Sequence, residues 1–210
     1  MKCEALANGI QNKVEYKQDA LIEEWPHSWP AGEISYRLNN FTDDITKDYH
    51  QTRAVTAALL TWQLEIKDLK FRREYNKNTS VDFEVSFKPL ENFTGPGVLA
   101  QAWFPGQGPI SGDVEINDNW DWVTHALIGD IGHPPLVPIL IHEFGHSLGL
   151  RHNVTQMDSI MYPSFNLGKK KNDLNDNDRE RIQSRYGKRT LSQRLRDYFM
   201  RRRDAGHDFR

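Results

Sequence analysis

The chain of 210 residues has one cysteine, no internal repeat and no long apolar run. Its single thiol, Cys3, excludes an internal disulfide and any metal site built from several thiolates, so a metal ion would need nitrogen and oxygen ligands. No apolar stretch approaches the roughly 18 to 20 residues of a membrane span. The first residues also lack the apolar stretch of a signal peptide. These absences turn attention to the eight histidines.

The composition is that of a folded domain. Hydrophobic residues make up 38 % of the chain and charged residues 27 %, which excludes wholesale disorder. The length suits one domain with a short appendage. The net charge of -2 is uneven, because residues 188–210 carry 8 Lys and Arg against 3 Asp and the preceding part is acidic. A mildly acidic body is therefore followed by a basic tail.

Hydrophobic periodicity predicts both strands and helices. Apolar residues alternate over residues 33–38 and 81–87, and shorter strands are predicted over 98–103 and around 114–116. Helical spacing predicts helices over residues 46–66, 136–148 and 176–186, with a basic helix over 190–203. Because the strands precede most of the helices, the pattern favours an α+β fold over an alternating α/β fold.

The most informative motif spans residues 142–152. On a helix, His142 and His146 lie one turn apart on the same face, so both imidazoles can bind one metal ion. Glu143 points beside that ion, where it reaches a water molecule on the metal without becoming a ligand. Gly149 allows the chain to leave the helix and return His152 as a third ligand. Three nitrogens and one open position are typical of a catalytic zinc site.

A structural alternative exists for each of these residues taken singly. One histidine on an apolar helix more often packs or forms a hydrogen bond than binds a metal. The motif, however, specifies five positions within eleven residues, and such a match is improbable by chance. The sequence therefore predicts a zinc centre with His142, His146 and His152 as ligands and Glu143 as the catalytic residue.

The motif resembles that of the metzincin clan, in which the third histidine is followed by a turn containing methionine. Met161 lies in the corresponding place, and the resemblance implies that it forms the floor beneath the metal. Within the clan, residues 25–187 are similar to the catalytic domain of the matrixins, the matrix metalloproteinases. The segments that carry this likeness are residues 34–42, 99–103, 105–106, 112–113 and 182–187.

The resemblance implies a zincin-like α+β fold. It consists of a twisted, mostly parallel five-stranded sheet with one antiparallel edge strand, and three main helices. It also implies three parts of the chain: an N-terminal arm over residues 1–24, the metallopeptidase domain over residues 25–187, and the basic tail over residues 188–210.

The implied activity is zinc-dependent hydrolysis of internal peptide bonds in extended protein substrates, such as extracellular matrix proteins, by attack of zinc-bound water with help from Glu143. Gly149, Met161 and Asp178 are the implied supporting residues. The implied substrate-binding residues are Leu99, Ala100, Pro138, Pro163 and Phe165.

The chain also departs from the matrixin pattern. Gln101 and Glu115 occupy the positions of two histidines that bind a second, structural zinc in the family, and no His-Gly-Asp segment is present. We therefore expect one catalytic zinc ion and no structural one. In the calcium-binding run, only Asp113 and Asp118 keep their carboxylates, so these two are the candidate calcium ligands.

Partners and alternatives complete the sequence-based expectations. The expected partners are protein or peptide substrates, and the basic tail is a candidate for binding polyanionic surfaces, with a solvated helix as the alternative. No specific nucleic acid is expected, and the chain is expected to be a monomer. The resemblance implies secretion, and four glycosylation sequons agree with this. The competing functions are those of another metzincin branch or a non-catalytic, zinc-containing binding module of the same fold.

Overall fold

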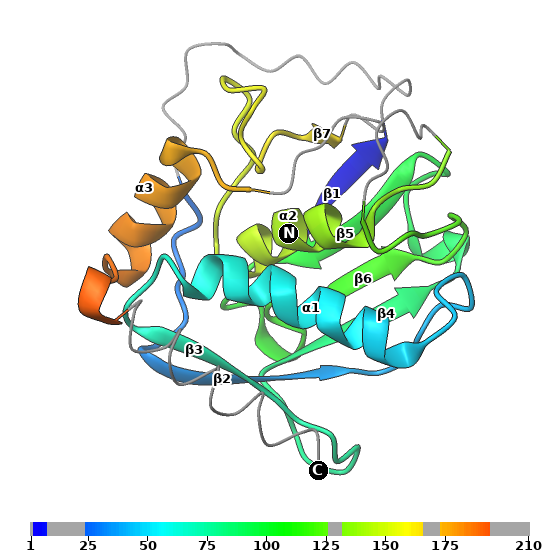
Figure 1. The fold of residues 1–210 in the computed structure, drawn as a ribbon, viewed down its shortest axis with the longest axis horizontal. Coiled ribbons are helices and arrows are strands. Elements are labelled where there is room, and N and C mark those ends of the chain that lie inside the picture. The colour runs from blue at the N-terminus through cyan, green and yellow to red at the C-terminus, as the bar shows by residue number, and fades with distance from the viewer. Residues whose placement is uncertain (1, 8–23, 126–131, 166–172, 194–210) are drawn as a thin grey trace.

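The computed structural model describes residues 2–7, 24–125, 132–165 and 173–193, with only the backbone given for residues 2–7. The predicted α+β fold is confirmed, with three main helices and a mixed sheet (Figure 1). The strands are β1 (Lys2–Ala7), β2 (Gly32–Leu38), β3 (Leu69–Arg73), β4 (Phe83–Lys88), β5 (Val98–Trp103), β6 (Val114–Asn117) and β7 (Ser164–Phe165). The helices are α1 (Asp48–Gln63), α2 (Leu136–Ser147) and α3 (Asp176–Tyr186).

The sheet has the strand order β3-β2-β4-β6-β5-β1-β7. Strands β3, β2, β4 and β6 are parallel, and β5 is antiparallel to β6. These five strands are the predicted mostly parallel sheet with one antiparallel member. Beyond β5 the sheet continues, because β1 pairs antiparallel with β5 and β7 pairs parallel with β1. The predicted edge strand β5 is therefore covered by a strand from the N-terminal arm.

Three strands were not located by the periodicity. In β3, Leu69 is buried and Phe71 packs against the core, but three basic residues between and after them mask the alternation. Strand β7 has two residues, too few for any period. Strand β1 lies in the arm, whose sequence lacks alternation, and its extended form comes from pairing with β5 and β7.

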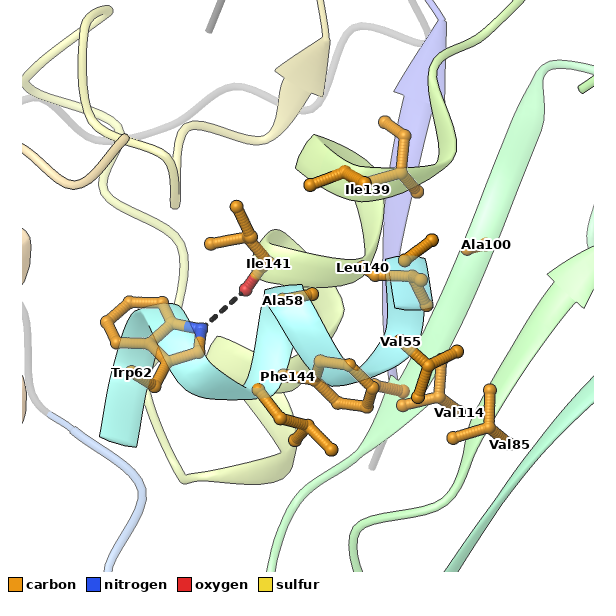
Figure 2. Packing of buried hydrophobic residues seen from close by; sticks show 14 of the residues in the cluster. Val55, Ala58, Trp62, Val85, Ala100, Val114, Ile139, Leu140, Ile141 and Phe144 are labelled. Atoms are coloured by element: carbon orange, nitrogen blue, oxygen red, sulfur yellow. Dashed lines mark hydrogen bonds between the residues drawn. The ribbon is translucent and has the colours of Figure 1, made fainter. Parts of the chain in front are cut away.

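Helices α1 and α2 cover one face of the sheet and pack against each other (Figure 1). Their interface includes Trp62 and Phe144, both fully buried (Figure 2). The indole Nε1 of Trp62 donates a hydrogen bond of 2.8 Å to the carbonyl oxygen of Ile141. Because a buried N–H without a partner would be costly, this bond fixes the relative position of the two helices. It thereby also fixes the helix that carries His142 and His146.

The start of the basic tail packs on the domain. The backbone N–H of Arg189 donates to the carbonyl oxygen of Glu65, and its guanidinium donates to that of Gln63 at the end of α1. The predicted helix over residues 190–203 lies largely outside the described residues, which end at residue 193 in this part of the chain. Within the described parts of the chain, no helix is long and apolar enough to cross a membrane.

Candidate metal centre and substrate groove

Helix α2 supplies two of the three predicted metal ligands. The helix is buried along its whole length, and Pro135 precedes its first residue. His142 and His146 lie one turn apart, and their Nε2 atoms are separated by 3.0 Å. Both side chains are almost completely buried. The helix therefore places two imidazole nitrogens close enough together to bind the same metal ion.

The third imidazole comes from the chain that leaves α2. Gly149 has a φ of +93°, which other residues adopt only with strain, and its N–H donates to the carbonyl oxygen of His146. The chain then turns back and places the Nε2 of His152 3.3 Å from that of His142. One ring nitrogen from each of the three histidines lies within 4.8 Å of the others. The structure thus brings the three predicted ligands together.

The tautomers of two histidines are fixed by backbone carbonyl groups. The Nδ1 of His142 lies 2.7 Å from the carbonyl oxygen of Ile160, and the Nδ1 of His146 lies 2.7 Å from that of Leu150. A carbonyl oxygen only accepts, so each Nδ1 carries the proton and each neutral imidazole turns a bare Nε2 lone pair toward the other. Two lone pairs at this separation repel unless a cation lies between them.

These nitrogens fit a zinc ion. Tetrahedral zinc with bonds of about 2.0 to 2.1 Å to nitrogen requires nitrogen atoms roughly 3.3 Å apart, close to the two observed separations. Burial lowers the pKa of His146 well below its usual value, and burial together with His142 and Arg181 lowers the pKa of His152 to about 3. Neutral imidazole is the form that binds a metal. The donor set is therefore suited to zinc.

A turn over residues 159–161 supports His142 from below. The buried carboxylate of Asp178, in the first turn of α3, accepts hydrogen bonds from the hydroxyl of Ser159 and, at 2.8 Å, from the backbone N–H of Ile160. The carbonyl oxygen of the same Ile160 holds the ring of His142. Asp178 therefore positions a metal-binding ring through one intervening residue.

Met161 lies against α2 at Gly145, between the two helical histidines. A Cβ atom at Gly145 would lie 2.3 Å from the Sδ of Met161 and 3.0 Å from the ring of Trp62. Only glycine allows this close approach. The methionine is fully buried, so the ring-bearing face of α2 rests on an apolar floor.

The turn between α2 and His152 is held by residues far away in the sequence. The carboxylate of Glu24 pairs with the guanidinium of Arg181 and accepts the N–H of Arg151. Arg181 also donates to the carbonyl oxygen of Arg151, at 2.7 Å. The indole of Trp29 and the hydroxyl of Tyr186 donate to carbonyl oxygens at the C-terminal end of α2. These contacts orient His152, and the motif alone did not reveal them.

Glu143 lies one residue after His142 on α2 and is fully buried. Neighbouring residues on a helix diverge by about 100°, so its side chain leaves the helix beside the histidine ring and not along the same line. The role of Glu143 as a general base stays a prediction. The backbone of Glu143 remains in the helix and accepts a hydrogen bond from the hydroxyl of Ser147.

The five predicted substrate-binding residues are buried in this structure. Leu99 and Ala100 belong to β5, and Ala100 pairs with Ala5 of β1. Pro163 precedes β7, and Phe165 belongs to it. Strand β1 therefore lies between the two elements predicted to bind substrate, paired with β5 on one edge and with β7 on the other. Pro138 lies inside α2, four residues before His142.

The two candidate calcium ligands are not brought together. Asp113 precedes β6 and Asp118 follows it, so an extended backbone separates them by about 16 Å. Among the described residues, the three histidines are the only group of three or more ligand side chains that converge closely enough to hold a metal ion. Calcium binding by Asp113 or by Asp118 stays a prediction.

The environment of Asp113 leads to a prediction about pH. Burial, aided by Glu84 and Glu115, raises the pKa of Asp113 to about 6. Because this pKa is above the unfolded value, the carboxyl group favours folding at low pH and this contribution is lost between about pH 4 and 6. We expect Asp113→Asn to stabilise the protein by about 1 kcal/mol at pH 7.5, a figure reduced for the partial exposure of the group.

Chemical denaturation of both proteins at pH 7.5 and pH 4.5 tests this expectation. The difference should shrink at the lower pH, where the aspartate is largely protonated. Asp121→Asn, which removes an exposed carboxylate after β6, controls for the change in net charge. An advantage of the asparagine that is the same at both pH values would show that titration of Asp113 is not its cause.

Gln101 and Glu115, the departure from the matrixin pattern at the second zinc position, form a hydrogen-bonded pair, and so do Asn153 and Asn177. The Nε2 of Gln101 donates to the Oε2 of Glu115, at 2.7 Å, across β5 and β6. The Nδ2 of Asn153, directly after His152, donates to the Oδ1 of Asn177 on α3, at 2.9 Å. In both pairs an amide of one side chain donates a hydrogen bond to an oxygen of the other. Neither pairing could be read from the sequence, since the partners are 14 and 24 residues apart.

Two aromatic residues near the metal centre were also missed. The ring of Phe104, just after β5, meets the ring of His146 edge-on with a centroid separation of 5.6 Å. Trp25 stacks on the ring of Phe104, with a centroid separation of 4.7 Å. The aromatic layer shields His146 from water. Aromatic residues after a strand are too common to signal such a contact in a sequence.

Comparisons with known proteins agree with the geometry. The family model described as Matrixin matches residues 25–187. Matrix metalloproteinase-18 of Xenopus laevis is 35% identical over 168 residues, which cover 77% of this chain and 34% of that protein. Stromelysin-1 of Equus caballus is 34% identical over 167 residues, covering 76% of this chain and 33% of the relative.

Matrilysin of Felis catus is 33% identical over 176 residues, which cover 79% of this chain and 62% of that protein. The chain spans about a third of the length of the first two relatives. The family model covers well over half of the chain, and the three histidines it contains converge as a zinc site requires. The chain therefore belongs to the matrixin family of zinc metalloendopeptidases.

Proposed function

We propose that this chain is a zinc-dependent endopeptidase that hydrolyses internal peptide bonds in extended segments of proteins. The observation that carries the proposal is the convergence of three imidazole nitrogens beside the buried Glu143. His142, His146 and His152 would hold the zinc ion. Zinc, when bound, supplies Lewis acidity, which lowers the pKa of a water molecule to about 7 and polarises a carbonyl group.

The protein's own groups supply the remaining steps. Strand β5 binds the substrate backbone by strand addition, which selects extended peptides over folded ones. The carboxylate of Glu143 accepts a proton from the attacking water and then donates it to the leaving nitrogen. One water molecule is consumed, the C–N bond breaks, and a carboxylate and an amine are formed. Proton transfer of this kind contributes about 10² to 10⁴ in rate.

We further propose that the enzyme acts as a monomer outside the cell, on proteins such as those of the extracellular matrix. Three of the four sequon asparagines, Asn40, Asn78 and Asn92, are exposed, whereas Asn153 is buried. The exposed sites are compatible with glycosylation during secretion. Residues 188–210, with their net positive charge, are proposed to attach the enzyme to polyanionic surfaces.

Metal analysis is the direct test of the proposed function. We expect one zinc ion per chain, complete loss of peptide hydrolysis on treatment with 1,10-phenanthroline, and recovery on adding back an equivalent of zinc. The ion number follows from the three converging histidines and from the hydrogen bond between Gln101 and Glu115 at the second position. Two tightly bound zinc ions per chain, or hydrolysis that survives removal of zinc, would contradict the proposal.

A further inference from the structure

A cavity lies between helix α1 and the segment that leads into α2. Its volume is about 350 Å³, which lies within the range of small-ligand sites in proteins. Among the described residues that line it, none is a predicted metal ligand and none is a predicted substrate-binding residue. The cavity is therefore lined by residues that the proposed peptidase reaction does not use.

Helix α1 forms one wall of the cavity, with two nitrogen-bearing side chains and two small ones. His50 and Arg53 are three residues apart, so their side chains lie on the same side of the helix. Ala54 and Ala57 also line the cavity, and their methyl groups leave its space open. The centroid of the Tyr49 ring lies 4.0 Å from that of the His50 ring. This contact limits the rotation of the imidazole.

The opposite wall is formed by the end of the segment before α2 and by the first turn of that helix. It consists of Thr124, His125 and Val137. The backbone N–H of Val137 donates to the carbonyl oxygen of Thr124, at 3.3 Å, and that of Leu136 donates to the carbonyl oxygen of Val123, at 2.7 Å. Because α1 packs against α2 (Figure 1), the two walls are held at a fixed separation.

The polar groups of the cavity are suited to an anion. Its described lining contains three side chains with N–H donors, His50, Arg53 and His125, and no aspartate or glutamate. Within the described parts of the chain, neither a hydrogen bond nor an ion pair engages these side chains, so their donors are available to a ligand. A metal ion does not fit, because it would lie beside a guanidinium and find only two imidazoles, fewer than the three or four ligands that zinc takes from a protein.

From these observations we infer that the cavity binds an organic ester of phosphate or sulfate. The planar fork of Arg53 donates two parallel hydrogen bonds to an oxyanion, and each imidazole donates a further one. A water molecule takes about 30 Å³ in the liquid, so a bare oxyanion, which has the size of a few water molecules, fills only part of the cavity. The space beside Ala54, Ala57 and Val137 takes the organic group. The site adds recognition of an anionic ester to the proposed hydrolysis of peptides.

Isothermal titration calorimetry on the zinc-loaded full chain tests this inference. The probes are glucose 6-phosphate and glucose 6-sulfate, and the comparisons are glucose, inorganic phosphate and inorganic sulfate. We expect at least one of the two esters to bind, with one molecule per chain and several-fold more tightly than the matching inorganic ion. Glucose should not bind, because it lacks the oxyanion. The tighter of the two esters identifies the oxyanion that the cavity takes.

Variants of the lining connect the binding to this cavity. Arg53→Gln removes two charge-assisted hydrogen bonds and should weaken binding of the ester by about tenfold or more. His125→Gln should weaken it several-fold. Ala57→Leu keeps every charge but fills the space, so it should weaken binding of the ester and leave that of the inorganic ion unchanged. All three residues are exposed, so the fold should be retained.

A control variant and nuclear magnetic resonance locate the bound ester. Lys70→Gln removes one exposed positive charge from β3 and should bind the ester like the wild type. The ring signals of His50 and His125, identified by their loss in His50→Gln and His125→Gln, should shift as the ester is added. Those of the three predicted zinc ligands should not shift.

Several results would overturn the inference. If neither ester binds at millimolar concentrations, or if glucose binds as tightly as its esters, the cavity does not recognise an oxyanion. Binding that survives Arg53→Gln and leaves both ring signals unmoved places the anion elsewhere, on the zinc ion or on the basic tail. Equal losses in Arg53→Gln and Lys70→Gln show attraction by net charge alone. Equal binding of ester and inorganic ion overturns the place of the organic group. None of these measurements depends on peptide hydrolysis, so the proposed function is tested separately.

Discussion

Glu143→Gln is expected to lower kcat/KM for peptide hydrolysis by about 10² to 10⁴, with one zinc ion still bound. Glutamine has nearly the same shape as glutamate, but its amide cannot accept a proton from water at neutral pH. Glu143 is fully buried on α2 and is not one of the three converging ligands. The loss should therefore fall on kcat, since zinc binding and the groove are retained.

The measurements are steady-state kinetics on a quenched peptide, zinc content, and thermal denaturation of the two proteins. Stability should be unchanged or slightly raised, because a buried carboxylate is replaced by a neutral group. Glu180→Gln, an exposed change on α3, is the matched control and should leave the kinetics as they are. Equal hydrolysis by Glu143→Gln and the wild type would show that proton transfer is not carried by Glu143.

The same pair of proteins decides between the proposed enzyme and a non-catalytic binding module. A module that keeps zinc for structure alone would bind one ion but cleave no peptide, and Glu143→Gln would change nothing. The burial of Glu143 beside His142 favours the enzyme, because a module has no need for a base next to an open metal position.

The sequence predicted the parts of the fold whose pattern is local. Helix α2 was bounded by prolines and Gly149, and the alternation of Phe83, Val85 and Phe87 marked the strand β4. The three histidines were predicted because a helical turn and a glycine bring them close together along the chain. A local period reports which face of an element is buried, as in β4, and proline and glycine report where a helix begins and ends, as in α2.

Other features depend on contacts between distant segments. Nothing in the sequence of residues 2–7 shows that they pair with β5. Their extended form comes from pairing with neighbouring strands and not from a local pattern. The ion pair of Glu24 with Arg181 and the contact of Asn153 with Asn177 also join segments that only the fold brings together. A single sequence contains charges and amides in abundance, and it does not say which of them meet.

Asp178→Ala is the second change expected to have a large effect. The carboxylate is fully buried and accepts hydrogen bonds from the hydroxyl of Ser159 and the N–H groups of Ile160 and Asn175. Its removal leaves buried donors without their acceptor, each costing about 1 to 3 kcal/mol. We expect the variant to lose about 3 to 5 kcal/mol of unfolding free energy.

The same change should weaken zinc binding. Ile160 donates its N–H to Asp178, and its carbonyl oxygen accepts the Nδ1–H of His142. Loss of the carboxylate leaves the N–H of Ile160 without its acceptor, so the carbonyl group that orients the ring of His142 is held less firmly. Removing a partner of this kind costs about 10- to 100-fold in metal affinity. Asp178→Asn, which keeps an oxygen for the backbone donors, should lie between the wild type and the alanine variant on both measures.

Chemical denaturation and competition with a zinc chelator measure the two effects separately. Asp176→Asn is the matched control, because Asp176 lies in the same first turn of α3 with an almost fully exposed side chain. It should change stability by less than about 0.5 kcal/mol. If Asp178→Ala unfolds more easily but binds zinc as tightly as the wild type, Asp178 acts only on the fold. If both the free energy of unfolding and the affinity for zinc fall, the carboxylate positions the metal centre through Ile160 and His142.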